Sequence, residues 1–149
     1  MYKRILVAVD GSPTSNKALT AALRMARDSG GKVLLVHSLD ELVYLSGFEY
    51  SGEVITIARE NAAKVLDDAM AIARAAGVEA DKKLVDQPGQ RLGQTVSEAA
   101  QAFDADLVVV GTHGRRGIGR VLMGSGAEQV IRMAPVPVLV IRGDAADAA

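Results

Sequence analysis

The chain has 149 residues, is 49% hydrophobic and carries a formal net charge of −1, which fits one compact domain with a full core. The near-neutral charge argues against a general nucleic-acid binder, because such proteins carry a broad basic surface. Cysteine is absent, which excludes disulfides, thiolate nucleophiles and cysteine-ligated metals and is compatible with a reducing compartment.

The N-terminal segment is basic and then apolar, as a signal peptide would be, but its apolar run ends at Asp10 after five residues. We interpret residues 4–9 as a buried strand instead, followed by a turn over 10–15. Nowhere does the chain contain the roughly 20 consecutive apolar residues that cross a bilayer. We therefore expect a soluble, cytoplasmic protein with no membrane partner.

Strands and helices alternate along the chain after that turn. Short apolar runs predict strands, and apolar residues that recur on one helical face predict helices, most clearly over 53–76. The segment 78–86 is more polar than the other strand segments and suits an edge position. After the first strand we predict four helices, over 16–31, 53–76, 89–103 and 126–134. They alternate with four more strands, over 32–39, 78–86, 105–111 and 136–142.

This alternation defines a fold class. Strands that are continuous apolar runs are buried on both faces, as in a parallel sheet between two helix layers. We predict an α/β fold, a doubly wound five-stranded parallel sheet with helices on both faces. It forms a single domain over residues 1–143, and residues 144–149 form a frayed tail.

Two glycine-containing loops follow predicted strands, "DGS" after the first and "GTHGRRG" after the fourth. Ligands of such sheets bind beyond the carboxyl ends of the strands, where the strand order reverses. Gly111 directly follows Val110 at the end of the fourth strand, so the backbone there can lie against a ligand. Arg115, Arg116 and Arg120 make the loop basic. If the two strands are neighbours, both loops border one crevice.

The helix predicted after this loop begins with an anion-binding pattern. Ser125 and Glu128 have the spacing of a capping box, and the free N–H groups of a helix start favour phosphate. The chain contains no G-x-x-x-x-G-K-[ST], and "GIGRVL" lacks the third glycine of a dinucleotide fingerprint. What it does contain is G-x2-G-x9-G-S, in which Gly111, Gly114, Gly124 and Ser125 occupy the fixed positions. The stretch is suited to a polyphosphate.

With this motif the chain resembles the universal stress protein family, of the ATP-binding type. The resemblance covers "ILVAVDGSPTSNKAL", "VLLVHSLD" and "ADLVVVGTHGRRGIGRVLMGSGAEQVIRMAPVPVLVIR", which is nearly the whole chain. It implies an adenine nucleotide alpha hydrolase-like sheet of order 3-2-1-4-5. It also implies contacts of Asp10 with the ribose, of Val9 and the backbone near Ser38 with the adenine, of Gly111 with the sugar, and of Gly114, Arg115, Gly124, Ser125, Gly126 and Ala127 with the phosphates.

Each of these residues also has a purely structural interpretation. Ser125 alone is an ordinary helix N-cap, and Asp10 alone is an ordinary turn residue. His37 is interpreted as a packed or hydrogen-bonded side chain rather than a metal ligand. His113, in the basic loop, is a minor candidate for proton transfer. It is the combination of these residues that favours a binding site.

The function predicted is that of an ATP- or ADP-binding regulatory protein of the stress response, with AMP or a cyclic nucleotide also open as the ligand. No catalytic triad, carboxylate pair or metal-ligand cluster is evident in the sequence, so we predict neither catalytic nor metal-binding residues. Slow ATP hydrolysis stays open, with Mg²⁺ bridging the phosphates and arginines stabilising them. The alternative is a protein-interaction or chaperone-like module in which the nucleotide is absent or structural.

Two further segments suggest interaction surfaces. Tyr44, Phe48 and Tyr50 lie in the connection after the second strand and suggest either a lid or a cover over the core. The fifth strand, at a sheet edge in the order that the resemblance implies, carries an unbroken apolar run. Such an edge invites pairing, so we predict a twofold homodimer through Val138, Leu139, Val140 and Ile141.

Overall fold

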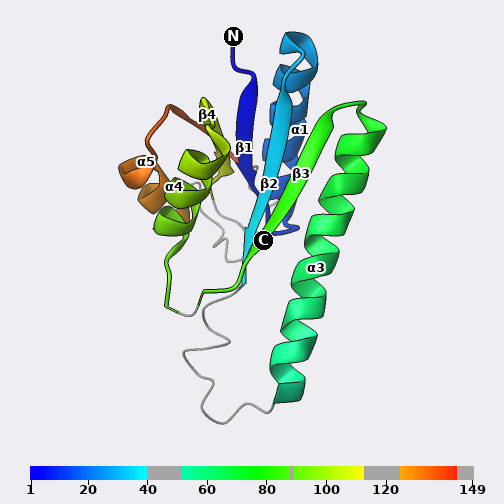
Figure 1. Cartoon of the computed structure of the whole chain (residues 1–149), viewed down its shortest axis with the longest axis vertical. Coiled ribbons are helices and arrows are strands. Elements are labelled where there is room, and N and C mark those ends of the chain that lie inside the picture. Colours follow the sequence, from blue (N-terminus) through cyan, green and yellow to red (C-terminus); the bar gives the residue numbers. More distant parts are fainter. Residues whose placement is uncertain (40–51, 88, 113–124, 144–149) are drawn as a thin grey trace.

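The computed structural model describes residues 1–39, 52–87, 89–112 and 125–143 of the chain. Within them, five strands form one all-parallel sheet in the order β3-β2-β1-β4-β5 (Figure 1). The strands are β1 (Arg4–Ala8), β2 (Lys32–Ser38), β3 (Glu79–Val85), β4 (Leu107–Gly111) and β5 (Val138–Ile141). The helices are α1 (Pro13–Ser29), α3 (Gly52–Ala75), α4 (Leu92–Phe103) and α5 (Ser125–Met133). The predicted fold class and strand order are confirmed.

The apolar runs of the central strands supply the core on both sides of the sheet. Because successive side chains of a strand point to opposite faces, Ile5 and Val7 pack against α1 and α3, and Leu6 packs against α4 and α5. Figure 1 shows the two helix pairs on opposite sides of the sheet. Each fully buried Val, Leu or Ile side chain contributes roughly 1.5–3 kcal/mol relative to exposure. The sheet is therefore a rigid platform for the loops at its edges.

Helix α1 begins earlier than predicted, at Pro13 instead of residue 16. The Ser12 hydroxyl accepts a hydrogen bond from the Ser15 N–H at 3.1 Å and caps the helix, and Pro13 occupies the first helical position. The helix ends at Ser29, where Gly30 takes the left-handed conformation with φ of 71°. The predicted turn over 10–15 therefore included the first three residues of the helix, whereas the sequence "SP" at 12–13 is typical of a helix start and is confirmed as one.

Other boundaries differ by one to three residues, and β5 is an instructive case. It begins at Val138, two residues later than predicted, because Pro137 has no N–H to donate to the neighbouring strand. The polar strand β3 lies at one edge of the sheet, as predicted. None of the helices in the described ranges is long and apolar enough to span a bilayer. The predicted tail, 144–149, lies outside the described residues.

Candidate functional site

The strand order reverses between β1 and β4, which are neighbours in the sheet. The register pairs Ala8 with Val36 and Val7 with Val109. When it is continued past the strand ends, Asp10 comes level with Ser38, and Val9 comes level with Gly111. Four residues predicted from the sequence, Val9, Asp10, Ser38 and Gly111, are thus brought together at one edge of the sheet, where ligands of this fold class bind.

Asp10 is held in place by a local network. Its Oδ1 accepts a hydrogen bond from the Ser12 N–H at 2.9 Å, and its own N–H donates to the Ser15 hydroxyl at 3.0 Å. Gly11 allows the turn because its φ is 83°, a value that few other residues adopt. Asp10 is therefore a turn residue, as its structural interpretation required. The same contacts fix its carboxylate at the end of β1.

The backbone of Val9 is occupied within the protein. Its N–H donates to the Val36 carbonyl at 2.9 Å, and its carbonyl accepts a hydrogen bond from His37 Nδ1 at 2.6 Å. Because a carbonyl can only accept, His37 carries its proton on Nδ1. The prediction that His37 is hydrogen-bonded is confirmed. Among the groups of Val9, the side chain is what remains to contact a ligand.

Two glycines in the predicted site have close neighbours within the protein. A Cβ on Gly111 would lie 2.7 Å from Cγ2 of Thr14 in the first turn of α1. A Cβ on Gly126 would lie 2.9 Å from Cδ2 of Leu92, at the start of α4. The structure shows that glycine at position 111 leaves room for α1. The predicted contact of Gly111 with a ligand stays a prediction.

The start of α5 carries the described part of the predicted phosphate site. Helix α5 begins at Ser125, so Gly126 and the buried Ala127 lie in its first turn, where N–H groups lack partners within the helix. Gly114, Arg115 and Gly124, with His113, lie outside the described residues, as does the side chain of Ser125. The capping box of Ser125 and Glu128 therefore stays a prediction, and so do the roles of the aromatic residues Tyr44, Phe48 and Tyr50.

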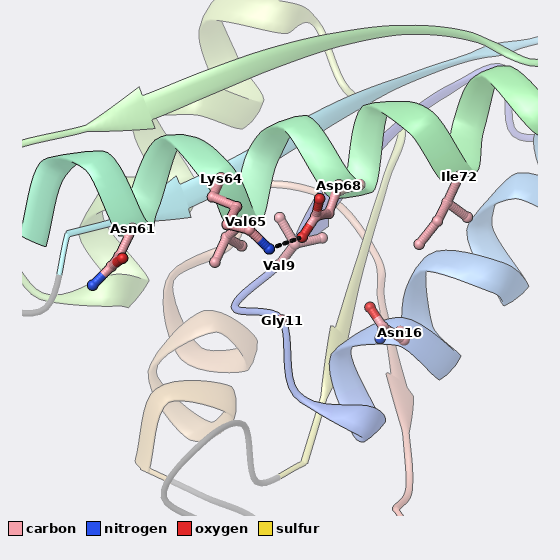
Figure 2. A pocket seen from close by; sticks show the side chains of 9 residues that line it. Val9, Gly11, Asn16, Asn61, Lys64, Val65, Asp68 and Ile72 are labelled. Atoms are coloured by element: carbon pink, nitrogen blue, oxygen red, sulfur yellow. Dashed lines mark hydrogen bonds and ion pairs between the residues drawn. The ribbon is translucent and has the colours of Figure 1, made fainter.

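A cavity of about 320 Å³ lies between α3 and the connection from β1 to α1 (Figure 2). Val9, Gly11 and Asn16 line it from one side, and Asn61, Val65 and Ile72 line it from α3. The sequence analysis found the apolar stripe of α3 but missed the polar residues beside it. Asn61 lies one helical turn before Val65, and this spacing was the available signal.

In the described part of the chain, no group of three or more histidine, aspartate and glutamate side chains could hold a metal ion. The edge and the cavity together present backbone groups, the oriented carboxylate of Asp10, the paired charges of Lys64 and Asp68, amides and apolar side chains. An arrangement of this kind can bind a polar ligand with an apolar portion.

The fold is that of a doubly wound α/β protein in which the strand order reverses between β1 and β4, the place where ligands of this fold class bind. The sequence model of the universal stress protein family matches residues 1–142, and the chain belongs to this family. It is 34% identical over 142 residues to the "Universal stress protein in QAH/OAS sulfhydrylase 3'region" of Thermus aquaticus, an alignment that covers 95% of this chain and 100% of that protein.

Solved structures show the same fold. The structure of protein MJ0577 has a TM-score of 0.83 and 26% identity, and the match covers 97% of this chain and 98% of that chain. The universal stress protein of Archaeoglobus fulgidus in complex with dAMP has a TM-score of 0.69 and 32% identity, with 94% of this chain and 98% of that chain covered.

Proposed function

We propose that this protein binds an adenine nucleotide at the carboxyl edge of the sheet, between β1 and β4. The observation that carries the proposal is the fixed carboxylate of Asp10 at the point where the strand order reverses. The dAMP complex of the Archaeoglobus fulgidus relative supports it, because dAMP contains the base, the sugar and one phosphate.

In this proposal the parts of the nucleotide follow the edge of the sheet. Asp10 accepts hydrogen bonds from the ribose, Gly111 passes beside the sugar, and the side chain of Val9 and the backbone near Ser38 contact the adenine. The phosphates lie at the N-terminus of α5, whose helix dipole favours anions. The phosphate-binding residues would be Gly114, Arg115, Gly124, Ser125, Gly126 and Ala127.

We further propose ATP or ADP as the working ligand, with Mg²⁺ bound chiefly to the phosphates. Mg²⁺ keeps several waters and binds readily to phosphate oxygens, and we propose no protein ligand for it. Any ATP hydrolysis would be slow, because it would depend on positioning and on charge neutralisation by Arg115 and its neighbours.

We also propose that the protein has a regulatory role in the stress response. Such a role needs a surface to which a partner can bind. Leu139 in the edge strand β5 is 36% exposed, and Ile131 and Met133 of α5 are also exposed large apolar residues. An apolar edge strand with unpaired backbone groups invites pairing with another chain. We infer that two chains form a homodimer through β5. In this dimer, the nucleotide bound to each protomer affects the state of the whole dimer.

The test is calorimetric titration of AMP into the wild type, Asp10→Asn and Asp28→Asn. Asparagine at position 10 keeps an oxygen for the Ser12 N–H but loses the charge, and hydrogen bonds to charged groups are stronger by about 1 kcal/mol or more. We expect affinity about tenfold weaker for Asp10→Asn and no change for Asp28→Asn, an exposed residue near the far end of α1. Absence of saturable binding to the wild type would overturn the proposal in favour of the protein-interaction module.

A further inference from the structure

The cavity between α3 and the start of α1 adjoins Asp10 directly. Val9 and Gly11, the residues on either side of Asp10 in the chain, both line it. Figure 2 shows Val9 below α3 and Gly11 on the loop that leads into α1. A nucleotide whose ribose contacts Asp10 can therefore place its base in this cavity.

The lining of the cavity is apolar at its floor. Val9, Val65 and Ala69 are each at least nine-tenths buried and contribute carbon surface from β1 and α3. Because both backbone polar groups of Val9 are bonded within the protein, it presents only its side chain. A floor of this kind suits a flat ring, since stacking on aliphatic carbon excludes water from both surfaces.

The charged residues of the cavity compensate each other. Lys64 Nζ lies 3.4 Å from Asp68 Oδ2 on the next turn of α3, and Figure 2 shows this pair at the cavity. A paired lysine is a weaker attraction for phosphate than an unpaired one. The cavity therefore fits an uncharged ring better than it fits an anion.

The remaining polar groups are amides. Asn61 on α3 and Asn16 on α1 are both exposed residues that line the cavity. Asn61 precedes Val65 by one helical turn, so its amide lies on the same side of α3 as the apolar floor. In Figure 2 it projects from α3 on the side facing the β1–α1 loop. It is positioned to meet the edge of a ring that lies on Val65.

We propose that this cavity receives the base of the nucleotide and that Asn61 is a specificity-determining residue that selects adenine. An asparagine amide offers one acceptor and one pair of donors, which match the amino group and N7 of adenine. At the same edge guanine presents two acceptors, O6 and N7, and one amide cannot donate to one of them while its oxygen accepts from the other, so the bidentate match is lost. The inference rests on the proposed function, because it concerns the same bound nucleotide.

The experiment compares Asn61→Leu with the wild type in titrations of AMP, GMP and purine riboside 5′-monophosphate, which lacks the amino group. A bidentate amide–adenine contact discriminates by 1–3 kcal/mol, so we expect the wild type to prefer AMP over each of the other ligands by about tenfold. In Asn61→Leu both preferences fall to about twofold or less. Asn61→Asp keeps the size but offers only acceptors. It still accepts from the amino group of adenine and repels the guanine oxygen, so it retains the preference for AMP over GMP while binding AMP more weakly.

Glu60→Leu is the matched control, since it puts leucine one residue earlier on α3, outside the cavity lining, and retains the preference for AMP. Circular dichroism verifies that each variant is folded. An unchanged AMP/GMP ratio in folded Asn61→Leu, with AMP still bound, overturns the role of Asn61 and leaves the proposed function intact. A wild type that binds none of the three ligands overturns both.

Discussion

The two edges of the sheet are built differently. The strand β3 has seven residues, and Glu79, Asp81, Lys82 and Lys83 along it are exposed. The strand β5 has four residues, all apolar, and each is only partly buried or exposed. An edge strand offers unpaired backbone groups to other chains, and charged side chains are a common protection against such pairing. By this criterion β3 is protected and β5 is not.

Ion pairs strengthen the contrast between the edges. Lys82 of β3 pairs with Asp67 of α3, and Asp86, just after β3, pairs with Arg59 at 2.8 Å. Beside β5, in contrast, α5 presents Ile131 and Met133, which are 44% and 45% exposed. The difference between the edges favours β5 over β3 as the edge for pairing, and β5 is where we propose the dimer.

The largest expected effect comes from a charge on β5. In Val140→Lys a lysine lies in the proposed dimer seam without a partner, and a buried unpaired charge costs about 3–5 kcal/mol. We expect the dimer to dissociate at least ~100-fold more readily. Sedimentation velocity at micromolar concentration measures this as a shift from dimer to monomer.

Because Val140 also packs against the α4–α5 core, Leu139→Lys is the companion variant that spares folding, since Leu139 is already 36% exposed. Asp81→Lys puts the same residue on β3 and leaves the oligomeric state unchanged. A wild type that sediments as a monomer contradicts the dimer, and a dimer that survives both β5 variants moves the interface elsewhere.

A smaller effect is expected when the protection of β3 is removed. In the double variant Asp81→Val, Lys83→Val the exposed edge becomes apolar on one face, as β5 is. We expect association beyond the dimer, because an apolar edge invites strand pairing. Light scattering over a concentration series measures it. The charge-swapped variant Asp81→Lys, Lys83→Asp is the control, and equal scattering by the two variants would mean that β3 needs no charges.

The sequence predicted the fold well because the central strands are continuous apolar runs, which few other structures accommodate. The strand order came from the family resemblance, and with that order the ends of β1 and β4 lie side by side, as the structure confirms. What it missed depends on contacts between distant segments. The occupied backbone of Val9 depends on His37, and the need for glycine at position 111 depends on Thr14.

The candidate cavity was missed for a related reason. Asn61 and Asn16 are 45 positions apart in the chain and lie on different helices, and an exposed asparagine carries no signal of its own in a helical pattern. The spacing of the apolar residues along α3 identified the residues of this helix that face the core. It did not identify the polar residues of α3 that lie beside them. Only the packing of α3 beside α1 shows that these amides share a space.

The smallest expected effect concerns the ion pair between Lys82 and Asp67. Both side chains are about half exposed, and exposed pairs contribute typically 0.2–1 kcal/mol. For Lys82→Gln we expect the free energy of unfolding, measured with urea, to fall by about 0.5 kcal/mol or less. Because salt screens exposed charges, the difference from the wild type disappears at about 1 M salt.

The oligomeric state stays that of the wild type, since Asp81 and Lys83 still protect the edge. A loss well above 1 kcal/mol that persists at high salt would mean that this pair holds β3 to α3, and that the charges of this edge serve stability more than the control of assembly.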